Sequence, residues 1–118
     1  MSIEDEILAN PVLRELGELL QSERAKEVLI NQTAKGLAKY RKTVDINDYS
    51  LVEWIDHAIE EAMDMMVYYN CIIKKLIDSG IKENDLIVQL FKSELLEMTH
   101  KVDFLVNFRN KKLESVKQ

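Results

Sequence analysis

The chain has 118 residues, of which 47% are hydrophobic and 31% are charged, and its formal net charge is −5. This length is typical of one domain, and this hydrophobic fraction is typical of a folded protein rather than a disordered one. The excess of acidic residues argues against nucleic acid as a partner, because binding to a phosphate backbone depends on Lys and Arg. We therefore expect a single domain over residues 1–118 and no nucleic-acid partner.

The composition predicts an all-α fold. Three Gly and one Pro leave few residues that interrupt helices, whereas Leu, Glu, Lys, Ile and Ala are abundant. We expect a helical bundle of three to four helices with a long central helix, and we expect it to form a homo-oligomer.

Three observations predict a cytoplasmic protein with no membrane partner. Cys71 is the only cysteine, which excludes an internal disulfide and fits a reducing compartment. Residues 1–10 are acidic and lack the basic start and apolar core of a signal peptide. No apolar run approaches the roughly 18 uncharged residues that a membrane span requires.

The first helix is predicted to begin at Asn10 and Pro11, because Asn caps free amides and Pro is favoured at the first helical position. It continues to about Gln21. Ser22 either interrupts this helix or caps a second segment that ends near Tyr40, and the sequence leaves both readings open. Residues 41–49 show no helical period and are predicted to form an ordered loop.

The central helix is predicted over residues 51–78. Ser50 and Glu53 have the spacing of a capping box, and Gly80 can adopt the left-handed conformation that closes a helix. At about 100° per residue, the helix has one broad apolar face and one narrow polar stripe. The apolar face comprises Leu51, Ile55, Ala58, Ala62, Met65, Met66, Tyr69, Ile72, Ile73 and Leu76, and the stripe comprises Glu53, His57, Glu60, Glu61, Asp64 and Tyr68.

The last helix is predicted from about Asp85 into the lysine-rich tail. Its apolar residues recur at alternating three and four positions, as in a coiled-coil seam: Val88, Phe91, Leu95, Met98, Val102 and Leu105. Further apolar residues widen this seam. We expect one face of the helix to meet the central helix and another to meet a second subunit.

Glu60, Glu61 and Asp64 form the most chemically specific feature of the chain. With His57 they lie within two helical turns, where like charges repel one another. A divalent cation such as Mg²⁺ would offset that repulsion, because it binds carboxylates and takes further ligands from water and substrate phosphates. The alternative is a solvated acidic strip, paired with lysines of a neighbouring helix.

Two neighbouring side chains have other expected roles. We expect His57 to contact the substrate and not the metal ion, since Mg²⁺ prefers oxygen ligands. Trp54 is either a packing anchor or a stacking platform for a base.

The stretch from Lys39 to Tyr69 resembles small phage and prophage proteins of the MazG-like, all-α nucleoside triphosphate pyrophosphohydrolases. The resemblance is carried by Tyr40, by Trp54-Ile55-Asp56-His57 followed by Glu60-Glu61-Ala62-Met63-Asp64, and by Tyr68-Tyr69. It implies that Glu60, Glu61 and Asp64 are catalytic magnesium ligands and that a (deoxy)nucleoside triphosphate is cleaved to the monophosphate and pyrophosphate. In such enzymes a second Glu-x-x-Asp element completes the site; the last helix here has Glu94, Glu97, His100 and Asp103 instead.

Substrate contacts are expected from residues that suit phosphates and bases. Lys39 and Arg41 can bind phosphate oxygens, and Tyr40, Trp54, His57 and Tyr68 can contact the base. Two alternatives stay open: an inactive phage protein that binds or sequesters a nucleotide signal, and a structural helical oligomer that acts through protein contacts.

Overall fold

The structure, a computed structural model, describes residues 2–111. These residues form five α-helices and one turn of 3-10 helix, without a strand, which confirms the all-α prediction. The chain divides into two compact units, Met1–Asp48 and Tyr49–Gln118, and each is described by itself. The single domain, the number of helices in one bundle and the oligomer stay predictions. In the described range no helix is both long and apolar enough to cross a membrane.

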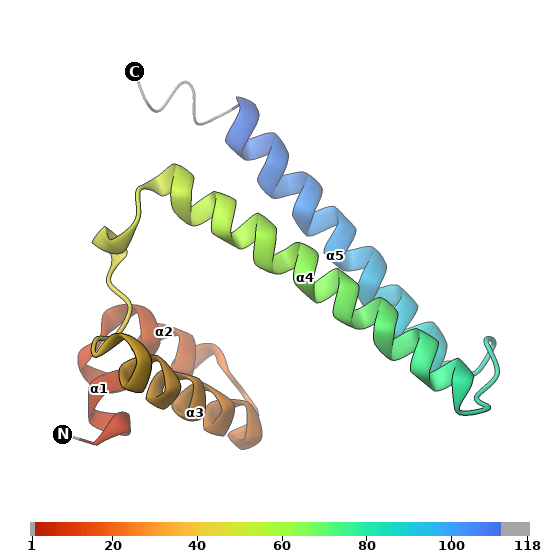
Figure 1. The fold of residues 1–118 in the computed structure, drawn as a ribbon, viewed down its shortest axis with the longest axis horizontal. Helices are drawn as coiled ribbons and strands as arrows, with labels where there is room; N and C mark the ends of the chain where they lie inside the picture. The colour runs from red at the N-terminus through yellow and green to blue at the C-terminus, as the bar shows by residue number, and fades with distance from the viewer. Residues whose placement is uncertain (1, 112–118) are drawn as a thin grey trace. The chain divides into compact units, whose positions relative to one another are not determined.

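The first unit contains α1 (Ile3–Ala9), α2 (Pro11–Leu19) and α3 (Glu23–Tyr40), coloured red to orange in Figure 1. Helix α1 lies before the predicted first helix and is an additional element. Its start is a capping box, in which the Ser2 hydroxyl accepts a hydrogen bond from the Asp5 N–H and the Asp5 carboxylate accepts one from the Ser2 N–H. Ser22 caps α3 after α2 has ended at Leu19, so the two segments are separate helices.

Asn10 connects three parts of the first unit. Its side-chain oxygen accepts hydrogen bonds from the N–H groups of Val12 and Leu13, which caps α2 as predicted. Its amide nitrogen donates to Thr43 Oγ1 at 3.1 Å and to the Val44 carbonyl at 2.7 Å. The loop after α3 is thereby fixed to the junction between α1 and α2.

The predicted loop is ordered and contains the 3-10 turn, Ile46–Asp48. Arg41 closes α3 in the left-handed conformation, with φ of 62°, which is unusual for a residue with a Cβ. Lys42 Nζ lies 2.5 Å from Asp48 Oδ1. That hydrogen bond, together with one from the Asp45 N–H, lowers the pKa of the Asp48 carboxyl.

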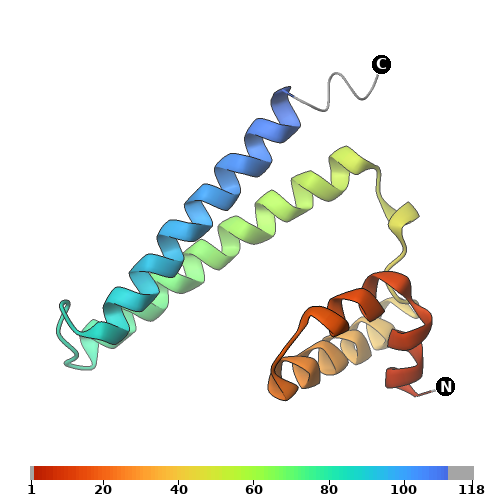
Figure 2. The same cartoon turned by 180° about the vertical axis from the view of Figure 1, so that it is seen from behind.

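The second unit is a hairpin of two antiparallel helices, α4 (Leu51–Asp78) and α5 (Leu86–Lys111), which lie side by side in both ribbon views (Figures 1 and 2). The predicted bounds of α4 are confirmed, as is its Ser50–Glu53 capping box. Gly80 has φ of 99°, and the Ile81 N–H donates to the Leu76 carbonyl, which ends the helix in the way predicted from the glycine.

A heptad-spaced seam holds α4 and α5 together. The buried or half-buried residues at heptad spacing are Val52, Ile55, Ile59, Ala62, Met66, Tyr69, Ile73 and Leu76 on α4, and Val88, Phe91, Leu95, Met98, Val102, Leu105 and Arg109 on α5. Val88 is completely buried, and the rings of Tyr69 and Phe91 lie 6.1 Å apart. The seam that the sequence identified on the last helix is therefore used inside the hairpin, against α4.

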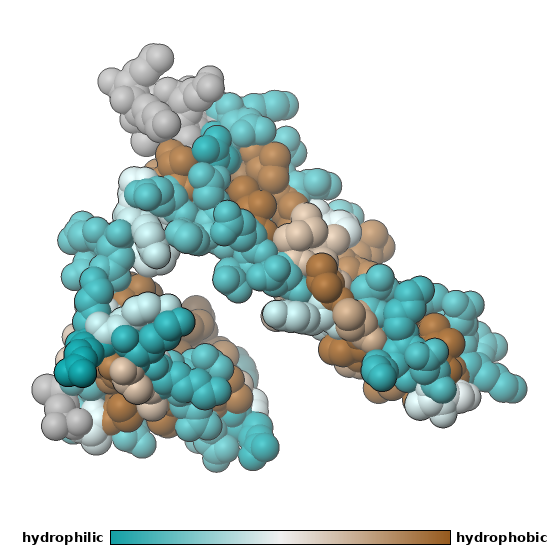
Figure 3. Space-filling view, viewed as in Figure 1, coloured by the Kyte–Doolittle hydropathy of each residue, from teal (hydrophilic) through white to brown (hydrophobic). Residues whose placement is uncertain are grey.

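The broad apolar face of α4 is only partly covered by α5. Leu51, Ala58, Met65 and Ile72, one residue before successive seam positions, remain exposed. The space-filling view shows hydrophobic side chains reaching the surface of both helices between hydrophilic ones (Figure 3). A two-helix hairpin cannot bury two apolar rows of one helix, because its partner helix covers only one side.

The open end of the hairpin is joined by an ion pair. Arg109 Nε lies 2.5 Å from Asp56 Oδ1, and Arg109 Nη2 lies 3.3 Å from Asp56 Oδ2, so the contact is bidentate. Asp56 raises the pKa of the Arg109 guanidinium through this hydrogen bond.

The buried seam predicts a large difference between two valines of the hairpin. Val88→Ala should lower the free energy of unfolding by about 1.5 kcal/mol, because two methyl groups leave a fully packed site. Val67→Ala is the matched control, since Val67 is 54% exposed, and its effect should stay within about 0.5 kcal/mol. Chemical denaturation measures both, and equal losses would contradict this packing.

Candidate functional site

Two contacts position the first turn of α4, where the candidate site begins. In the capping box, the Ser50 N–H donates to Glu53 Oε1 at 3.0 Å and the Glu53 N–H donates to Ser50 Oγ at 3.2 Å. The Tyr49 and Trp54 rings meet edge to face at 4.8 Å. These are the positions of a hydrophobic staple, which fixes the direction from which the chain enters a helix.

The same tyrosine also contacts the candidate histidine. The Tyr49 ring lies 4.4 Å from the His57 ring, and His57 Nδ1 lies 3.9 Å from Glu60 Oε2, an ion pair when the imidazole is protonated. Tyr49, Trp54 and His57 thus form an aromatic cluster at the N-terminal end of the acidic stripe. The His57 side chain stays half exposed, so it can still contact a ligand.

Sequence reasoning missed Tyr49 as a member of this cluster. The signal was present, because Tyr49 directly precedes the capping Ser50 and Trp54 is the fourth residue after that serine. Aromatic or aliphatic residues at these two positions predict a staple. The contact shows that Trp54 packs against Tyr49, which supports its reading as a packing anchor.

Glu60, Glu61 and Asp64 are exposed on the side of α4 that faces away from α5, because Ile59, Ala62 and Met66 occupy the side in contact with α5. Among residues 2–111, neither Glu61 nor Asp64 forms an ion pair, and the ion pair of Glu60 is with His57. The alternative of pairing with lysines of a neighbouring helix is therefore not seen within the described hairpin.

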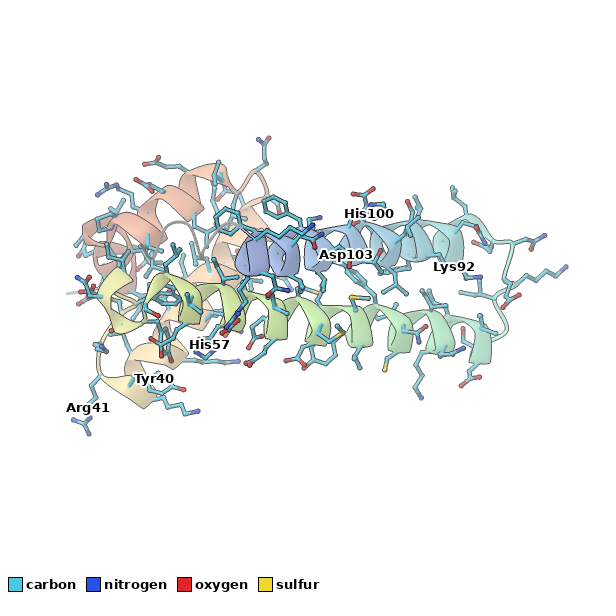
Figure 4. All side chains as sticks on the ribbon, turned by 90° about the horizontal axis from the view of Figure 1, so that it is seen from above. Tyr40, Arg41, His57, Lys92, His100 and Asp103 are labelled. Carbon is cyan, nitrogen blue, oxygen red and sulfur yellow. The ribbon has the colours of Figure 1, made fainter. Side chains whose placement is uncertain are left out.

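The acidic residues of α5 are not brought to this stripe. Glu94, Glu97, His100 and Asp103 are exposed, and Figure 4 shows His100 on the side of α5 that points away from α4. The seam occupies the space between the helices. In the part of the chain that the structure describes, no group of three or more His, Cys, Asp or Glu side chains is arranged to hold a metal ion. The carboxylates have the donor chemistry of a magnesium site, but residues 2–111 do not gather three such groups around one point.

The other predicted substrate contacts lie in two places. Lys39, Tyr40 and Arg41 lie at the C-terminal end of α3 in the first unit (Figure 4), where Lys39 Nζ is 5.1 Å from the centre of the Tyr40 ring. Tyr68 lies on α4, two turns beyond Glu61, and is 62% exposed. All four side chains, Lys39, Tyr40 and Arg41 of the first unit and Tyr68 of the second, are exposed and can contact a ligand.

No family model matches the chain, and neither the search of curated proteins nor the search of solved structures found a match. The MazG-like resemblance therefore stays a prediction.

The capping box makes the start of α4 sensitive to acid. Hydrogen bonds from the backbone and side chain of Ser50 lower the pKa of the Glu53 carboxyl from its usual 4.5. A depressed pKa means that the charged form stabilises the fold above that value, and that this contribution is lost as the pH falls through the lowered pKa. Wild type should therefore exceed Glu53→Gln in melting temperature at pH 7, and the difference should shrink towards pH 3.

The Ser50→Ala background provides the control for this prediction. Because Ser50 supplies the hydroxyl of the capping box, Glu53→Gln should have a smaller pH-dependent effect when Ser50 is already alanine. A difference between wild type and Glu53→Gln that does not change from pH 7 to pH 3 would contradict the assignment.

Proposed function

We propose that the outward stripe of α4 binds a nucleotide together with Mg²⁺, and that the chain hydrolyses a (deoxy)nucleoside triphosphate to the monophosphate and pyrophosphate. The observation that carries this proposal is the uncompensated charge of the stripe. Glu60, Glu61 and Asp64 are exposed within two turns, and among residues 2–111 no lysine or arginine forms an ion pair with Glu61 or Asp64. A cation coordinated by one or two of these carboxylates can complete its shell with phosphate oxygens and water.

The roles of the chain follow from its side-chain chemistry. In the hydrolysis, a water oxygen bonds to phosphorus, the phosphoanhydride bond to the leaving pyrophosphate breaks, and a carboxylate of the stripe accepts the proton of the water. Magnesium, when bound, neutralises charge on the phosphates. The partly exposed rings of Tyr49, Trp54 and His57, with Tyr68, are candidates for contacts to the base. Lys39, Tyr40 and Arg41 of the first unit stay predicted substrate contacts.

One observation favours binding without turnover as a second candidate. The acidic residues of α5 do not face the stripe, so a single hairpin presents the acidic element of one helix only. Such a site can hold a nucleotide signal and sequester it without cleaving it.

A nucleotide screen separates the two candidates. Thermal shift and pyrophosphate release are measured in the same wells, with and without Mg²⁺. Hydrolysis predicts magnesium-dependent release that Glu61→Gln abolishes and that Glu18→Gln, an exposed glutamate of α2, leaves within about twofold. A thermal shift without release identifies sequestration. Neither a shift nor release from any nucleotide would refute both.

We also infer that the chain forms homo-oligomers through its hairpin. The supporting observation is the exposed row of Leu51, Ala58, Met65 and Ile72 on α4, which the internal seam leaves uncovered. Burial of such a row against a second apolar surface is favourable by about 25 cal/mol per Å² of apolar area.

Sedimentation equilibrium tests this self-association directly. We expect the apparent mass to exceed 13.8 kDa at micromolar concentration and to fall when Met65→Glu places a charge in the exposed row. Asp64→Glu, one position away and outside the row, is the control that should leave the mass unchanged. A monomer at 100 µM would show that the row is not an interface.

A further inference from the structure

Both helices of the hairpin have a second row of exposed residues beside the buried seam. On α4 the row is Leu51, Ala58, Met65 and Ile72; on α5 it is Ile87, Glu94, Lys101 and Phe108. Every one of these residues directly precedes a seam position and is exposed. Because the helices are antiparallel, corresponding flanking rows lie on the same side of the hairpin, so the two rows together form one face. We call it the flank face.

The pattern of this face is typical of a helix in a four-helix bundle. A two-stranded coiled coil needs apolar residues at two positions of each heptad, whereas a bundle helix carries a third apolar position beside them. On α4 the third position is apolar in all four heptads. On α5, Ile87 and Phe108 are apolar at the two ends, and Leu90 and Phe104 extend the exposed apolar surface beside them.

The two charges of the flank face indicate what covers it. Along α5 the row reads apolar, acidic, basic, apolar, at constant spacings of seven residues. Reversing the direction of this row exchanges Glu94 with Lys101 and Ile87 with Phe108. A second copy of α5 that runs antiparallel therefore places Glu94 against Lys101 of the second copy and Ile87 against Phe108 of the second copy, twice over in a two-fold dimer.

We propose that two copies of the chain pair through their flank faces, about a two-fold axis perpendicular to the hairpins, to give an antiparallel four-helix bundle. This proposal rests on the self-association inferred above and specifies its face, its direction and its register. Neighbouring α4 helices then meet through their apolar rows without a charge in them. A dimer with parallel hairpins would instead set Glu94 and Lys101 against the apolar row of α4, and it would leave both charges unpaired.

This arrangement leaves the outward stripe of α4 accessible. Asp64 and His57 do not belong to the flank face, and Glu61 lies at its edge, next to the row that contains Ala58 and Met65. The proposed dimer therefore buries the apolar rows and keeps Glu60 and Asp64 exposed.

Charge reversal of the proposed pair provides the test. Glu94→Lys alone, or Lys101→Glu alone, replaces two attractive contacts per dimer with two repulsive ones, and should raise the dimer dissociation constant by about tenfold at low ionic strength. The double variant restores opposite charges in exchanged positions and should return to within about threefold of wild type. Sedimentation equilibrium in about 50 mM salt, where screening is weak, measures all four proteins.

Two control variants match the net charge of the test variants. Asp103→Lys and Lys92→Glu change charge by the same amounts on exposed positions of α5 outside the flank face, and both residues are labelled in Figure 4. They should alter dissociation by less than about threefold. Helical circular dichroism confirms that each variant is folded.

Each other outcome contradicts a stated part of the proposal. A dimer that neither single reversal weakens excludes this register, and so does a double variant that stays as weak as the singles. A wild-type chain that is monomeric at every concentration excludes self-association itself, and the dimer with it. The nucleotide screen is independent of all these results, because it measures ligand binding and pyrophosphate release at the outward stripe and not self-association.

Discussion

The structure of the second unit depends on the seam between α4 and α5. Residues at alternating spacings of three and four on both helices bury one another, with Val88 fully enclosed and Ile73 nearly so. Once these residues face inward, the helical period determines where every other side chain of the hairpin points. The seam thus sets the outward direction of Glu60 and Asp64, and it also leaves the flank face uncovered. At the open end, the bidentate Asp56–Arg109 pair joins the first turns of α4 to the last turns of α5.

The chemistry of the stripe follows from this orientation. Carboxylates that faced α5 would be partly buried and would need partners there, whereas carboxylates that face outward can keep their charge in water and bind a cation with its own ligands. The aromatic cluster of Tyr49, Trp54 and His57 forms at the same end of α4 because the capping box and the staple fix the entry of the chain. The charged stripe of α4 and the aromatic cluster at its N-terminal end are thereby placed next to each other, an arrangement that the proposed nucleotide site would use. The dimer that we propose would place two such stripes on one bundle.

The sequence was sufficient for the features that depend on local patterns. The bounds of α4, its capping box, the terminating Gly80 and the cap at Asn10 all follow from short-range rules, and the structure confirms them.

The sequence was insufficient where the position of a side chain depends on residues far away in the chain. Periodicity assigns Leu51, Ala58, Met65 and Ile72 to the apolar face of α4 and omits Ile59, because it does not say which part of a broad face the partner helix covers. The acidic residues of α5 were candidates for completing the site for the same reason; their direction is set by the seam. Helix α1 and Tyr49 could have been predicted, since the Ser2–Asp5 and Tyr49–Trp54 spacings are both recognised helix-start patterns.

The distance between the tips of two hairpins tests the antiparallel bundle most directly. A nitroxide spin label at position 84, introduced by Asn84→Cys in a Cys71→Ser background, lies in the turn between α4 and α5. In the antiparallel bundle the two tips lie at opposite ends, and the pairing of Glu94 with Lys101 of the second copy places them about 40 Å apart at 1.5 Å per residue. Pulsed electron–electron double resonance between the two spin labels should give one distance population near that value. A population well under about 20 Å, as expected for neighbouring helices of parallel hairpins, or the absence of any intermolecular distance, would contradict the account.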